Sequence, residues 1–177
     1  MYRTISNEII RTFNSCYDPS KFITDENEEL TVKYWVQKYR KVVPAKDILW
    51  LLLRKEFLSE KDLRLFAVWC AREALKLAEN PDKIIVNACN VVEKFANGEA
   101  TKEELDEATT VAYAYTVFAS IAYASYAVAS AASIDAVRAA HDASSYAVRA
   151  AAIYADNVAY NDAAIYAAQL EQLLTYF

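Results

Sequence analysis

The stretch from Thr101 to Phe177 contains neither glycine nor proline and consists mostly of Ala, Tyr, Val, Ile, Ser and Asp. Alanine has the highest helix propensity, and no strong helix breaker interrupts the stretch, so we expect it to be helical. One unbroken helix of this length would extend about 110 Å at about 1.5 Å per residue, far beyond a compact domain. The stretch must therefore fold back on itself. We expect helix breaks near Ser133-Ile134-Asp135 and near Tyr160-Asn161-Asp162, where short polar side chains can cap a new helix.

The rest of the composition also favours a single all-α domain. The chain has 177 residues, enough to bury a sizeable core, and 55% of them are hydrophobic. One glycine and three prolines are too few for a turn-rich all-β fold or for a glycine-rich phosphate-binding loop. We therefore predict a helical bundle of about seven or eight helices. Residues 1–100 would form its mixed-charge helical half, and residues 101–177 a long Ala-rich C-terminal hairpin of acidic helices.

Hydrophobic residues recur at helical spacing through residues 1–100 and predict five helices there. Residue types typical of helix ends mark several boundaries. Ser59 with Asp62, and Thr101 with Glu104, have the spacing of capping boxes. Pro81 suits the first position of a helix, and Gly98 can adopt the left-handed conformation that ends one. The expected helices run from Ile5 to near Cys16, from Thr31 to Arg40, from Ala45 to Leu53, from Ser59 to about Glu79 and from Pro81 to Asn97.

Charge is distributed unevenly between the two halves. Residues 1–100 carry 16 Lys or Arg and 15 Asp or Glu, whereas residues 101–177 carry three and nine, a net charge of −6. An acidic half disfavours direct binding of nucleic acid, whose phosphates are contacted by Lys and Arg, and favours a basic protein partner. Tyrosine fills gaps in an Ala-rich core but is also enriched in protein interfaces, so some of the 13 tyrosines are candidate anchors. The candidate partner-binding residues are Glu103, Glu107, Asp135, Asp142 and Asp156, with Tyr123, Tyr126 and Tyr146.

A small basic patch lies within the helix predicted after Thr31. It consists of Lys33, Lys38, Arg40 and Lys41. This patch is either an ordinary solvated helix face or a surface that meets an acidic partner.

No arrangement of residues in the sequence indicates an active site or a metal centre. His141 is the only histidine, and adjacent helical residues point in different directions, so His141 and Asp142 cannot act as a base and its orienting carboxylate. We expect His141 to lie on the surface of an Ala-rich helix. Cys16, Cys70 and Cys89 are widely spaced and lack the spacing of zinc ligands, and we expect them to be buried and reduced. The chain is therefore predicted to be no enzyme and to need no cofactor or metal.

The sequence also predicts a soluble, cytoplasmic protein that does not insert into a membrane. Its longest apolar runs, such as Ile48 to Leu53, are too short to span a bilayer. The first residues lack the apolar region of a signal peptide.

Several segments occur in an order that resembles a known family. They are Asp47-Ile48-Leu49-Trp50-Leu51-Leu52, then Asp62 to Arg72 with the sequence DLRLFAVWCAR, Asn80-Pro81, Ala96 to Leu105 with the sequence ANGEATKEEL, the long Ala-rich tail, and Gln169-Leu170 followed by Leu173-Leu174. Together they resemble the all-α immunity proteins of bacterial toxin systems, a type also found on phage genomes. The resemblance implies a non-catalytic inhibitor that binds and blocks a toxin. It further implies that Asp47 pairs with Arg64 or Arg72 and that Trp50, Phe66 and Cys70 belong to the core.

The expected function is therefore binding and neutralisation of a basic toxin or nuclease, with electrostatic attraction steering the two proteins together. One alternative is a phage-encoded inhibitor of a bacterial defence nuclease, of the anti-CRISPR type, in which the acidic surface would occupy a nucleic-acid channel. Another alternative is a self-assembling structural protein, in which Ala-rich helix faces form a homo-oligomer. Solution mass separates the last alternative from the other two.

Overall fold

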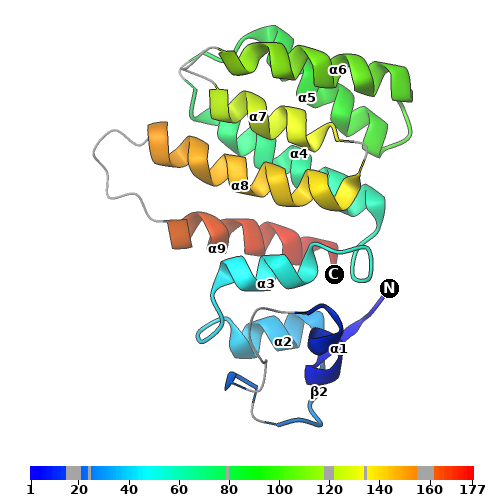
Figure 1. The fold of residues 1–177 in the computed structure, drawn as a ribbon, viewed down its shortest axis with the longest axis vertical. Helices are drawn as coiled ribbons and strands as arrows, with labels where there is room; N and C mark the ends of the chain where they lie inside the picture. Colours follow the sequence, from blue (N-terminus) through cyan, green and yellow to red (C-terminus); the bar gives the residue numbers. More distant parts are fainter. Residues whose placement is uncertain (15–20, 24, 79, 118–121, 134, 155–161) are drawn as a thin grey trace.

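The computed structural model describes residues 1–14, 21–23, 25–78, 80–117, 122–133, 135–154 and 162–177. Within these ranges it contains nine α-helices and one two-stranded sheet, which confirms the all-α class with at least one helix more than expected. Helices α3 to α9 lie across the longest axis of the molecule and are stacked along it (Figure 1). The elements are β1 (Thr4–Ser6), α1 (Asn7–Thr12), β2 (Glu29–Thr31), α2 (Val32–Tyr39), α3 (Ala45–Leu52), α4 (Glu60–Lys76), α5 (Lys83–Ala96), α6 (Lys102–Ala114), the 3₁₀ turn η2 (Tyr115–Val117), α7 (Ala122–Ala131), α8 (Ala136–Tyr154), α9 (Asp162–Leu173) and the 3₁₀ turn η3 (Leu174–Tyr176).

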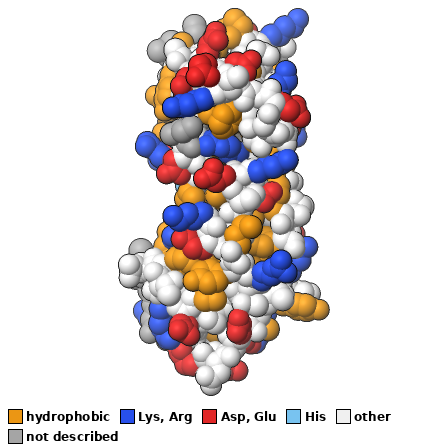
Figure 2. Space-filling view, turned by 90° about the vertical axis from the view of Figure 1, so that its right-hand side faces the viewer, with side chains coloured by type: hydrophobic (Ala, Val, Ile, Leu, Met, Phe, Trp, Pro, Cys, Tyr) orange, Lys and Arg blue, Asp and Glu red, His pale blue; other side chains and the backbone are white. Residues whose placement is uncertain are grey.

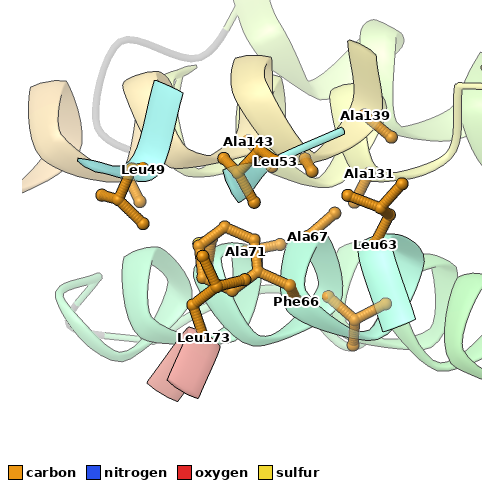
Figure 3. Close-up of a cluster of buried hydrophobic side chains, with 14 of the residues drawn as sticks. Leu49, Leu53, Leu63, Phe66, Ala67, Ala71, Ala131, Ala139, Ala143 and Leu173 are labelled. Carbon is orange, nitrogen blue, oxygen red and sulfur yellow. The ribbon is translucent and has the colours of Figure 1, made fainter. Parts of the chain in front are cut away.

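Helix α4 is the centre of the bundle, because α5, α7 and α8 all pack against it. Figure 3 shows the contact with α8, where Ala139 and Ala143 lie opposite Ala67 and Ala71 of α4. All four alanines are 0% exposed. A methyl group is the smallest side chain that still favours a helix, so these positions let the two helix backbones approach closely.

The C-terminal helix α9 packs between α3 and α8 (Figure 1). Its Leu170 and Leu173 are buried at 1% and 0% exposure. Gln169 is also buried and pairs with Ser144 of α8: the Ser144 hydroxyl donates to Gln169 Oε1 at 2.7 Å, and Gln169 Nε2 donates to the Ser144 carbonyl at 3.1 Å. Polar atoms buried in a helix interface need such partners, and here the pair fixes α9 against α8. The end of the chain thus completes the core around α3.

The first predicted helix is partly wrong, because its first turn is a strand. Ile5 lies in β1, where it is opposite Leu30 of the antiparallel strand β2 and 0% exposed. Helix α1 begins only at Asn7, after Ser6, whose hydroxyl accepts from the Ile9 amide at 3.3 Å. Over so short an apolar run, the spacing of the apolar residues cannot distinguish a helix from a strand. Here the residues before Asn7 pair with β2 and form a strand. Cys16, the predicted end of this helix, lies outside the described residues.

In its described residues, the Ala-rich half forms four helices, α6 to α9, two more than a simple hairpin has. The break predicted around Ser133 and Asp135 is confirmed, since α7 ends at Ala131 and α8 begins at Ala136. Of the second predicted break, Tyr160 and Asn161 lie outside the described residues, and Asp162 is the first residue of α9. A third break, at the 3₁₀ turn η2, was not predicted because no glycine, proline or capping motif marks it.

The predicted helix ends are largely confirmed. Thr101 and Glu104 form a reciprocal capping box, and the Ser59 hydroxyl accepts from the Asp62 amide at 3.1 Å. Gly98 has φ +77°, as expected for a left-handed helix end. Pro81, in contrast, precedes the cap residue Asp82 and does not occupy the first helical position.

The expected pairing of Asp47 with an arginine of α4 is wrong. Arg72 forms an ion pair with Glu93 of α5. Arg64 is 4% exposed, and its Nη1 donates to the carbonyl of Ser133 at 2.5 Å. The two arginines therefore tie α4 to α5 and to the segment between α7 and α8, while α3, which carries Asp47, packs against α9.

Candidate protein-binding surface

Helix α6 concentrates acidic side chains at its start. Glu103, Glu104, Asp106 and Glu107 all lie in its first six residues and are exposed. Acidic residues stabilise this end of a helix because they face the positive end of its dipole, and Glu104 also accepts from the Thr101 amide at 2.7 Å. Capping explains Glu104, whereas the other three carboxylates have no ion-pair partner among the described residues and can act on a partner protein.

A first hollow, of about 320 Å³, lies between α5 and α6; we call it the α5–α6 hollow. Apolar side chains from both helices line it: Ala88, Val91, Ala108 and Val111. Polar groups at its edge include Glu104, Glu107 and Asn87, and Ile84, 53% exposed, completes the lining. An aliphatic chain can lie on the apolar residues while a cationic group at its end reaches the carboxylates. Lysine and arginine side chains have this composition.

A second hollow, of about 260 Å³, lies on the other side of α6, where α7 and α8 meet it; we call it the α6–α8 hollow. Small residues of α7 line it together with Asp106 and Tyr113 of α6 and Asp142 of α8. Tyr113 is 52% exposed. Asp142 is already engaged by Arg138, whose Nε lies 3.3 Å from its carboxylate, so this hollow is less acidic than the first. Helix α6 is thus a ridge between two hollows, which we call the α6 ridge.

Of the predicted acidic residues, Glu107 and Asp142 line these two hollows, and Glu103 lies one helical turn before Glu107. Asp135 has a different role, because its Oδ1 accepts from the Val137 and Arg138 amides at 2.9 and 3.1 Å and caps α8. Asp156 lies outside the described residues.

The three predicted tyrosines gather in one cluster on α7 and α8. The rings of Tyr126 and Tyr146 stack with centroids 5.0 Å apart, and Tyr123 lies 6.4 Å from each. Arg149 lies over the Tyr146 ring at 5.7 Å. All three tyrosines are half-buried, so they fill the surface between the helices and show only part of each ring. In Figure 1, the first half of α7, which carries Tyr123 and Tyr126, lies at the opposite end from the start of α6, so the predicted residues do not form one patch.

The charge of this region is mixed. On the face drawn in Figure 2, acidic side chains near the upper end lie among lysine and arginine side chains, with apolar patches between them. On this face, the acidic side chains therefore do not form a continuous patch.

His141 differs from its prediction, because it is half-buried and does not lie fully on the surface of α8. Burial, with the nearby Arg54 guanidinium, lowers the pKa of His141 below its ordinary value. The prediction missed this because α8 packs against the centre of the bundle along most of its length.

Among the described residues, no group of His, Cys, Asp or Glu is arranged to hold a metal ion. Cys70 and Cys89 are buried and free, as predicted, and burial raises the pKa of the Cys89 thiol to about 11. Phe66 is likewise core at 0% exposure, whereas Trp50 is only partly buried. No helix within the described ranges combines the length and the apolar character needed to cross a membrane.

A scan against models of protein families, a search of curated proteins and a search of solved structures each gave no match for this chain. The candidate surface therefore rests on its own geometry.

Sequence reasoning missed part of this surface. It placed Glu104 only in a capping box with Thr101, and it did not consider Asp106, Ile84 or Tyr113 as part of a binding surface. A signal for Ile84 existed, because it lies off the buried stripe of Ile85, Ala88 and Val92 at helical spacing.

Proposed function

We propose that the chain is a non-catalytic protein-binding inhibitor that blocks a basic toxin or nuclease and contacts it through the α6 ridge. The observation that carries this proposal is the α5–α6 hollow, where the carboxylates of Glu104 and Glu107 stand beside an apolar lining. A partner segment rich in Lys or Arg suits such a surface, since its aliphatic stems bury against the lining and its charges meet the carboxylates.

The family resemblance and the net charge of −6 in residues 101–177 support the same proposal. Negative charge attracts a basic effector over long distances and raises the rate of association, although salt screens it. An inhibitor of this kind acts by covering the functional surface of the effector and needs no catalytic group of its own.

The test is affinity capture from lysate of the native host, with the full chain as bait and mass spectrometry of the retained proteins. We expect one basic effector in a stoichiometric complex, and addition of the chain should abolish the activity of that purified effector. The double variant Glu103→Lys/Glu107→Lys should weaken the complex at least tenfold. Glu8→Lys is the matched control, because Glu8 is an exposed glutamate in the first turn of α1 and should leave affinity unchanged.

Asp135 is not part of this charge reversal, because its replacement would remove the cap of α8. A weaker complex could then result from a less stable fold as well as from a lost contact. Equal capture by the double variant would exclude the α6 ridge as the contact. A captured defence nuclease would move the assignment to the anti-CRISPR alternative, and a multimeric chain with no captured effector would favour self-assembly.

A further inference from the structure

A hollow of about 510 Å³ lies where the start of the chain, the α3–α4 connection and the last residues meet; we call it the basic hollow. Its lining includes the apolar residues Val32, Phe57, Leu58 and Phe177, with Arg3 and Lys33. Ligand-binding pockets typically measure about 300–1,000 Å³, with apolar walls and a few polar groups. The basic hollow has this size and this composition.

The walls of the basic hollow belong to the folded core. Phe57 and Leu58 are 4% and 2% exposed, and Val32 is 2% exposed. The Val32 amide donates to the Arg3 carbonyl at 3.3 Å and holds the start of α2 beside the first strand. The Tyr2 ring packs on Phe57 with centroids 5.7 Å apart. Because these contacts exist without a ligand, binding would require little reorganisation.

The charged groups of the basic hollow are available to a ligand. Lys38 and Arg40, on and just after α2, are held in ion pairs. Arg3 and Lys33 are exposed, and neither has an ion-pair partner within the described part of the chain. The one side-chain carboxylate in the lining, Asp62, accepts a hydrogen bond at 2.5 Å from the hydroxyl of Ser59, the cap residue of α4. The two cationic side chains outnumber this carboxylate, so the side chains of the lining carry a net positive charge.

We propose that the basic hollow binds a short segment of a partner protein in which a carboxylate side chain stands next to a large apolar side chain. The apolar side chain packs on Val32, Phe57 and Leu58, and the carboxylate meets Arg3 and Lys33. This site has the opposite charge preference to the α6 ridge and does not depend on it.

A polyanion such as nucleic acid fits less well. Two cations neutralise only two phosphates, whereas tight nucleic-acid binding uses about 6–10 phosphate contacts. The chain as a whole carries a net charge of −5, which repels an extended polyanion.

The test is a titration of the ¹⁵N-labelled full chain, followed by amide chemical shifts, with the peptide acetyl-Glu-Phe-Glu-Leu-amide as probe. We expect saturable shifts centred on the amides of Arg3, Val32, Lys33 and Leu58. In one control peptide both glutamates are replaced by lysine, and in the other both apolar residues are replaced by alanine. Each control peptide should bind at least tenfold more weakly than the probe. Arg3→Glu/Lys33→Glu should reduce affinity for the probe at least tenfold.

Lys41→Glu is the matched control, because Lys41 is exposed just after α2 and outside the basic hollow, and it should change affinity less than twofold. Arg3→Gln/Lys33→Gln removes the two charges without reversing them and should give an intermediate loss of affinity for the probe. This second variant keeps the test valid if Arg3→Glu/Lys33→Glu fails to fold. The proposal is overturned if millimolar probe causes no shifts, if the lysine peptide binds equally well, or if the shifts lie elsewhere. Stronger shifts at the same amides with an oligothymidylate would overturn it in favour of nucleic acid.

Discussion

Replacing Ala143 with leucine tests whether α4 and α8 are as closely packed as their alanine contact implies. Ala143 is 0% exposed and faces α4 at Ala71, so three added carbon atoms have no space between the helices (Figure 3). Inserting methylene groups into a packed core typically costs about 1–3 kcal/mol, because side chains leave their preferred rotamers or backbones separate. Leucine and alanine are both strong helix formers, so helix propensity adds little to this figure.

The matched control is Ala168→Leu, the same change at an exposed position in the middle of α9. It should alter stability by no more than about 0.5 kcal/mol. Urea unfolding followed by circular dichroism measures both free energies, and for a chain of this size a loss of about 2 kcal/mol lowers Tm by roughly 4–8 °C. If Ala143→Leu were as stable as Ala168→Leu, α4 and α8 could not be in close backbone contact, and the role assigned to alanine would be wrong.

Three further predictions concern helix caps and pH. Thr101→Ala removes the capping box of α6 and should cost about 1 kcal/mol in thermal or urea unfolding, whereas Thr101→Ser should cost much less. Asp135→Ala should cost a similar amount, about 1 kcal/mol, and should speed hydrogen exchange in the first turn of α8; unchanged exchange would show that the cap is unimportant. Folding lowers the pKa of His141, so the unfolded chain binds a proton at higher pH than the folded chain does. This contribution to stability is complete above the ordinary pKa of about 6.5 and is lost as pH falls below it. His141→Gln should therefore flatten the pH dependence of the free energy of unfolding between pH values of about 5 and 7, and an unaltered slope would contradict the burial of the imidazole.

Local signals in the sequence predicted the helices that carry them. Gly98, Thr101 and Ser59 sit at helix ends in the structure because capping depends only on residues within one turn. The break before Asp135 was predicted for the same reason. These features require no knowledge of what packs against the helix.

Features that depend on distant residues were not predictable from one sequence. Ile5 pairs with Leu30 in a strand, and Arg64 binds the Ser133 carbonyl 69 positions away, so neither contact leaves a local pattern. The same limit applies to the candidate site. Acidic residues of α6 were identified from their charge, but the hollows beside them exist only because α5 and α7 pack against that helix.

The position of α9 has a consequence for how the chain folds during synthesis. Leu49 and Leu52 of α3 lie in a core that Leu170 and Leu173 complete, so the ribosome makes about 120 residues between the two parts. At a synthesis rate of about 5–20 residues per second, roughly 6–24 s pass between the synthesis of α3 and that of its partner helix α9. During this time its leucines and Trp50 are exposed to chaperones and to other nascent chains. We expect a chain ending at residue 161 to bind a hydrophobic dye strongly, and a separate α9 peptide to suppress that binding.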